Sequence, residues 1–171
     1  MKRFGLLVLV ATVWVAGCDD DNGTAPSAQP LVFSALLSPA NEVPPVGNAE
    51  SSGRGAMQIT IVPTRDSSGA ITAATANIHF QLYDFPGGVA MTGAHVHTGV
   101  AGLNGPIRID TGIRPGEIVL TDGSIERNFT GIVVDPVVAQ GIESDPSAWY
   151  FNVHSTLNPG GFSRGQLARV R

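Results

Sequence analysis

Cysteine and lysine are almost absent from this chain, whose 171 residues include Cys18 as the only cysteine and Lys2 as the only lysine. A single cysteine cannot form an intramolecular disulfide, so stability must come from packing, with or without a bound metal ion. The chain also has no phosphate-binding glycine loop, no Gly-x-Ser-x-Gly nucleophile elbow and no internal repeat. These absences argue against a disulfide scaffold, a P-loop enzyme and an α/β-hydrolase.

The N-terminal segment has the parts of an export signal. Lys2 and Arg3 provide a positive start, and residues 4–15 form an almost unbroken apolar run. That run is shorter than the roughly 20 residues that span a bilayer, and it matches the apolar region of a signal peptide. The sequence Val15-Ala16-Gly17-Cys18 resembles the bacterial lipobox. We therefore predict that residues 1–17 are a signal peptide and that Cys18 carries the lipid; the alternative is an ordinary signal peptide with a chance cysteine.

Lipidation of Cys18 would place the mature protein in the cell envelope, anchored to a membrane on the extracytoplasmic side, either periplasmic or at the cell surface. Two acyl chains are enough for stable anchoring. Residues 18–30 are polar and rich in Asp, Pro and small side chains, which is typical of a flexible tether. Residues 31–171 have the length of one domain.

Positive charge is scarce in the mature chain. Removal of residues 1–17 takes two of the ten basic residues and leaves eight against 14 acidic residues, a net charge near −6. An acidic surface without lysine argues against nucleic acid as a partner, because such binding depends on neutralising phosphates. It also argues against a polybasic membrane patch. An envelope or extracellular protein remains a candidate partner of unknown identity.

Short apolar runs separated by turns predict an all-β domain. The chain has 21 glycines and 12 prolines, and several runs alternate apolar and polar residues with the period of two that is typical of strands. One helix is expected to start at Pro136 with Asp135 as its cap. We therefore predict an antiparallel, Greek-key-like β-sandwich with one short helix. The expected strands are 31–37, 55–62, 71–83, 94–97, 106–109, 117–120, 125–134, 149–154 and 165–170.

Three histidines are the candidate metal ligands. In a strand, residues two apart point to the same face, so His95 and His97 should lie together with Val96 facing the core. The alternation around His154 places it on the polar face of another strand. Three neutral imidazoles are suited to copper or zinc. The alternative is that all three are surface or hydrogen-bonded histidines without a metal.

Three other polar residues could support such a site or could be structural. Glu42 lies in a proline-rich turn, Asn152 shares a strand face with His154, and Arg164 begins the last expected strand. Glu42 or Asn152 could orient an imidazole, with Asn152 the better candidate. The simpler interpretation is that Glu42 and Arg164 form an ion pair or bind loop backbone. His79 is expected to be solvated.

Several motifs of the mature chain resemble the CHRD domain, a module named for chordin and also found in bacterial proteins. The matching stretches are Phe33-Ser34-Ala35-Leu36 with residues 41–46, Gly93-Ala94-His95-Val96-His97 with residues 99–106, Tyr150-Phe151-Asn152-Val153-His154, and residues 159–167. The chain departs from the family at Phe162-Ser163, where an acidic and an aliphatic residue are common, and at Ser155, where threonine is usual. The resemblance implies an extracellular binding module without naming a ligand.

The histidine motif also looks like the copper-ligand strand of copper-zinc superoxide dismutase, although the zinc-loop histidines and paired cysteines of that enzyme have no counterpart. The sequence thus leaves two functions open. The first is an envelope-anchored binding module that holds copper or another transition metal through His95, His97 and His154. The second is a copper-dependent redox protein acting on superoxide or in electron transfer. A blue-copper site is disfavoured because it needs a thiolate, and Cys18 is assigned to lipid.

We expect the protein to incorporate labelled palmitate when it is expressed in a bacterial host, because the Val-Ala-Gly-Cys junction places the Cys18 thiol at the lipidation point. The Cys18→Ala variant should lose the label and leave the membrane fraction. Release of an unlabelled, soluble mature protein that retains Cys18 would contradict the prediction.

Overall fold

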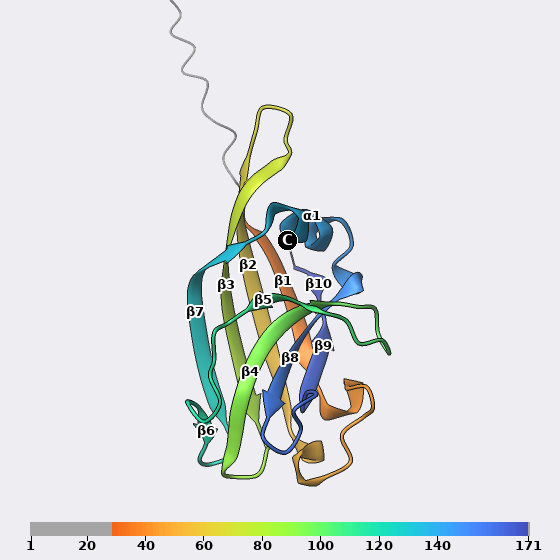
Figure 1. The fold of residues 1–171 in the computed structure, drawn as a ribbon, viewed down its shortest axis with the longest axis vertical. Helices are drawn as coiled ribbons and strands as arrows, with labels where there is room; N and C mark the ends of the chain where they lie inside the picture. Colours follow the sequence, from red (N-terminus) through yellow and green to blue (C-terminus); the bar gives the residue numbers. More distant parts are fainter. Residues whose placement is uncertain (1–28, 171) are drawn as a thin grey trace, which may run out of the picture.

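The computed structural model describes residues 29–170, which form two antiparallel β-sheets packed face to face (Figure 1). One sheet has the strand order β10-β1-β2-β3-β7, and the other has the order β5-β4-β8-β9 with β6 also paired to β4. The strands are β1 (Leu31–Leu37), β2 (Arg54–Arg65), β3 (Ile71–Tyr83), β4 (Val89–Thr98), β5 (Ile107–Asp110), β6 (Val119–Leu120), β7 (Ile125–Val134), β8 (Trp149–Ser155), β9 (Ser163–Gln166) and β10 (Ala168–Arg169). The signal peptide, Cys18 and most of the tether lie outside the described residues.

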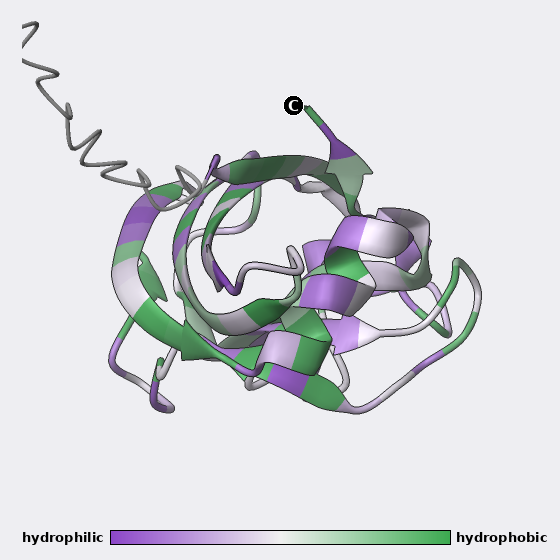
Figure 2. Cartoon of the chain, turned by 90° about the horizontal axis from the view of Figure 1, so that it is seen from above, coloured by the Kyte–Doolittle hydropathy of each residue, from purple (hydrophilic) through white to green (hydrophobic). Residues whose placement is uncertain are grey.

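Alternation along the strands builds the core between the sheets. In β2, Ile59 and Ile61 are fully buried while Gln58 is exposed, and Ile78 of β3 lies directly opposite Ile59. Hydrophobic and hydrophilic bands alternate along the strands of the sandwich (Figure 2). Burial of such side chains is the main stabilising contribution, about 1.5–3 kcal/mol for each large apolar group.

The single α-helix, α1 (Pro136–Ser144), covers one end of the sandwich (Figure 1). The Asp135 side chain accepts a hydrogen bond from the Val137 N–H, and Pro136 occupies the first turn, as the sequence predicts. Short 3₁₀ helices at Pro39–Asn41, Ala49–Ser52 and Pro146–Ala148 shape the connections. Within residues 29–170 no helix has the length and apolar character needed to cross a membrane.

The antiparallel β-sandwich class is confirmed, and β1, β3 and β7 have the predicted bounds. The expected final strand over 165–170 is instead two strands in different sheets, because β9 pairs with β8 whereas β10 pairs with β1. Leu167 lies between them, is 2% exposed, and donates its backbone N–H to Trp149 O at 2.9 Å. A buried leucine at this point thus marks where the chain crosses from one sheet to the other.

The polar face of β8 is less exposed than its alternation indicates. Phe151 points into the core, where its ring centroid lies 5.5 Å from that of Phe80. Tyr150 and Asn152, on the opposite face, are nevertheless only 2% exposed each. Loop contacts, described below, cover this face, so these polar groups must find their partners within the protein.

We expect Phe80→Ala to lower the free energy of unfolding by about 3–5 kcal/mol, because Phe80 is fully buried and the truncation leaves a cavity. Val133→Ala is the matched control: its parent side chain is 84% exposed, and the change should stay within about 0.5 kcal/mol. Urea denaturation measures both values, and equal losses would contradict this assignment of the core.

Candidate metal centre

The register between β4 and β8 places the three histidines on one face. The opposed pairs are Gly93 with His154, His95 with Asn152, and His97 with Tyr150. Val96 lies between His95 and His97 and points to the opposite face, where it is fully buried in the core, as the period of two predicts. One ring nitrogen from each of His95, His97 and His154 lies within 4.8 Å of the others. The three side chains could therefore hold a metal ion.

Backbone carbonyls orient two of the rings. Nδ1 of His97 lies 2.9 Å from Gly105 O, and Nδ1 of His154 lies 2.9 Å from Pro159 O. A carbonyl can only accept, so in the neutral ring the Nδ1 atom carries the hydrogen and Nε2 keeps its lone pair. Both Nε2 atoms are buried and have no hydrogen-bond partner within the described part of the chain. This arrangement presents a lone pair from each ring to the site.

In His95 the two ring nitrogens exchange these roles. Its Nε2 lies 3.4 Å from Asp110 Oδ1, and its Nδ1 is the buried atom that lacks a hydrogen-bond partner among residues 29–170. The ring folds back over Gly93, where a Cβ would come within 2.6 Å of Cε1. Only glycine at position 93 leaves room for this rotamer, which explains the glycine of the Gly93-Ala94-His95 motif.

Burial keeps the imidazoles neutral near pH 7. The pKa of His95 is lowered to about 4, mainly by desolvation and also by the charges of His154 and His97, while Asp110 opposes the shift. Desolvation is also the main cause that lowers the pKa of His97 and of His154. Neutral imidazole is the form that binds a metal ion, so the site is in its binding state without prior loss of a proton.

Arg164 connects the histidine face to the covering loop. Its guanidinium lies 3.3 Å above the centre of the Tyr150 ring, and that ring stacks on His97 at 4.8 Å with an angle of 8°. The same guanidinium donates to Val100 O at 3.1 Å and to Leu103 O at 2.9 Å. Arg164 is 1% exposed, so these acceptors replace the water it has lost.

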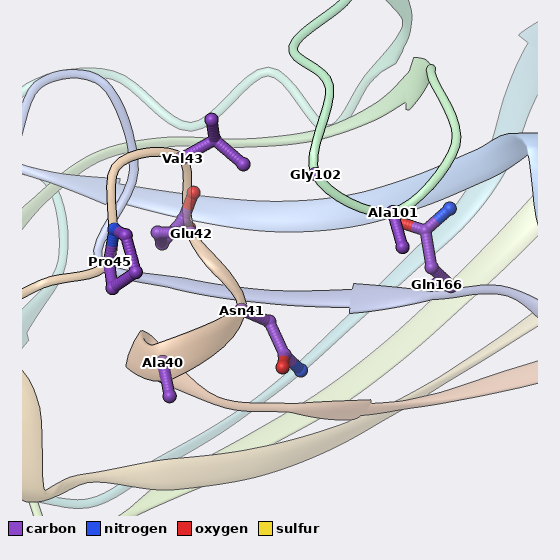
Figure 3. Close-up of a pocket in the computed structure, with 8 residues that line it drawn as sticks. All are labelled: Ala40, Asn41, Glu42, Val43, Pro45, Ala101, Gly102 and Gln166. Atoms are coloured by element: carbon purple, nitrogen blue, oxygen red, sulfur yellow. The ribbon is translucent and has the colours of Figure 1, made fainter.

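Glu42 is buried next to this network and beside a cleft. It is 4% exposed, and burial raises its pKa to about 7 although Arg164 and Asn152 lower it. The cleft, about 520 Å³ in volume, lies between the segment that carries Glu42 and the loop of Ala101 and Gly102 (Figure 3). The side chain of Glu42 is thus positioned between the surface cleft and the interior.

Comparison with known families gives a match over most of the chain: the family model described as the CHRD domain matches residues 33–167. The chain belongs to the CHRD domain family. No curated protein and no solved structure matches it. The resemblance seen in the sequence motifs is therefore confirmed at the level of the family.

The residues that the sequence analysis singled out do not all lie at the histidine site. Arg164 binds loop backbone, which the simpler interpretation predicted, whereas no ion pair joins it to Glu42 among the described residues. The carbonyls of Gly105 and Pro159, which sequence reasoning missed, orient two rings. A backbone acceptor has no residue signature, so only the spacing of glycines in residues 99–106 hinted at this role. His79 lies on the other sheet, 2.7 Å from Glu126, and does not take part.

We expect Glu42→Gln to become more stable relative to wild type as pH rises from 5 to 8. A carboxyl whose pKa is raised by folding contributes full stability below about 4.5, and that contribution is lost as pH rises through about 7. The glutamine variant lacks this loss, so the difference in unfolding free energy should grow by on the order of 3 kcal/mol. Urea denaturation at each pH measures it, and parallel pH profiles would contradict the buried carboxyl.

Proposed function

We propose that this protein is an envelope-anchored CHRD binding module that holds copper through His95, His97 and His154. The observation that carries the proposal is the convergence of the three rings, with one nitrogen of each within 4.8 Å of the others and one buried, partnerless nitrogen on each ring. Unpaired polar atoms are uncommon in protein interiors, because leaving one unpaired costs about 1–3 kcal/mol. A bound ion would satisfy all three at once.

The donor set favours a borderline metal such as copper, with zinc as the next candidate. Imidazole suits both ions, and the described residues provide three such ligands without a carboxylate or thiolate in the same group. Hard ions such as Ca²⁺ and Mg²⁺ require oxygen ligands and are disfavoured. Lipidation of Cys18 would keep this site outside the cytoplasm, near the membrane surface.

A copper-dependent redox activity is the second candidate function. The cluster among residues 29–170 contains three protein ligands rather than four, and a metal with an open position can accept a reacting molecule. A closed structural site would instead have four protein ligands. Rapid oxidation and reduction of the copper-loaded protein by superoxide would favour the redox role, and a copper ion that resists both would favour the binding module.

We expect the purified protein to bind one Cu(II) ion. Loss of a residue that only supports a ligand typically weakens metal binding about 10–100-fold, and His97→Ala or His154→Ala should weaken it by more than this. His79→Ala is the matched control, because His79 pairs with Glu126 on the other sheet. Competition with a chromophoric chelator measures the affinities. Wild-type affinity in both site variants would refute the three-histidine site.

The pH dependence gives a separate check. Protonation of imidazole competes with metal binding, and the folded protein lowers the pKa of all three rings. Copper affinity should therefore persist as pH falls below 6.5, the ordinary pKa of histidine, and decline only at more acidic pH. A decline centred at 6.5 would indicate solvent-exposed histidines instead.

A further inference from the structure

The buried polar atoms that lack a hydrogen-bond partner include more than the three histidine nitrogens. Six buried side-chain nitrogen or oxygen atoms among residues 29–170 lack a hydrogen-bond partner, and three of them are the ring nitrogens. Two others are Asn152 Oδ1 and Glu42 Oε1. Because a metal ion at the three rings satisfies only the nitrogens, these two oxygens require an explanation of their own.

Asn152 lies in the same row of cross-strand neighbours as His95. The row crosses four strands and consists of Asp110 in β5, His95 in β4, Asn152 in β8 and Arg164 in β9. Residues opposed in this way share a face of the sheet, with Cβ atoms about 4.5–5.5 Å apart. Asn152 therefore stands on the histidine face of β8, directly opposite His95.

Glu42 lies close to the amide nitrogen of Asn152. A Cβ on Gly161 would be 2.6 Å from Asn152 Nδ2 and 2.6 Å from Glu42 Oε1, so both groups pack against the same glycine. Nδ2 also donates a hydrogen bond to Gly160 O at 3.5 Å. The NH₂ group of an amide only donates and its oxygen only accepts. Because the Nδ2 side faces these acceptors, Oδ1 points away from them, and it is the amide atom that has no partner among residues 29–170.

We infer that Asn152 is the fourth polar group of the metal site, an oxygen acceptor directed at the ion's remaining position, and that Glu42 holds the amide in this orientation. The inference rests on the proposed metal site. Three imidazoles leave one position for water or another small ligand. An acceptor beside that position favours a ligand that carries a hydrogen, such as water or an amine, over one that only accepts, such as azide.

The test uses Cu(II) and azide as probes on the purified protein. Asn152→Leu should weaken Cu(II) binding by about 10–100-fold, alter the electron paramagnetic resonance spectrum, and bind azide more tightly than wild type, because displacing water then loses no hydrogen bond. Glu42→Leu should shift all three readouts in the same direction. Glu42→Gln retains an acceptor oxygen and should behave as wild type.

Glu50→Gln is the matched control. Glu50 is also a buried carboxylate, 3% exposed, but it accepts from Ser155 Oγ and from the Asn158 side chain rather than from Asn152. This variant should leave the Cu(II) spectrum and the azide affinity unchanged. Wild-type behaviour of Asn152→Leu, or an equal change in Glu50→Gln, would overturn the inference.

Two further outcomes separate this inference from the proposed function. If wild type binds no Cu(II), the metal site itself fails, whereas wild-type binding with no effect of Asn152→Leu refutes only the role of Asn152. A metal-free measurement remains decisive if the leucine variants do not fold. The side-chain amide protons of Asn152 should exchange slowly in wild type and in Glu42→Gln, and rapid exchange in the folded wild type would refute the Glu42 contact.

Discussion

The buried guanidinium of Arg164 is the interaction on which the arrangement of the histidine face depends. Its planar fork reaches two carbonyls of the 99–106 loop and the Asn104 side chain, while its face covers Tyr150. That loop in turn provides the carbonyl that orients His97. A lysine could not replace it, because an ammonium offers neither the flat stacking surface nor the several fixed donors.

Desolvation by the same covering segments determines the charge state of the site. The covering segments remove water from the imidazoles and from Glu42, which favours the neutral form of each group. The pKa of each histidine is therefore lowered, and the pKa of Glu42 is raised. Arg164 stays charged because its acceptors compensate for lost hydration. The site is therefore a low-dielectric pocket of neutral donors, in which a cation would be the dominant local charge.

The surroundings of Gly93 and Gly161 explain why these positions need glycine. At Gly93 a side chain would collide with the His95 ring, and at Gly161 it would collide with Glu42 and Asn152. Neither glycine contributes a functional group. Each one instead allows a neighbouring polar side chain to approach the backbone, so that the rotamers of the site are set by close packing rather than by further hydrogen bonds.

The sequence by itself determined the sandwich class, most strand positions, the capped helix and the shared face of His95 and His97, because period-two alternation and capping are local properties of the chain. It also nominated His154 and Asn152 correctly as residues of one face. Tertiary structure alone decided which β8 residues oppose which β4 residues, that the polar face of β8 is covered, and that carbonyls of Gly105 and Pro159 orient the rings. Register, burial and backbone acceptors arise from segments far apart in the chain, so no local pattern encodes them.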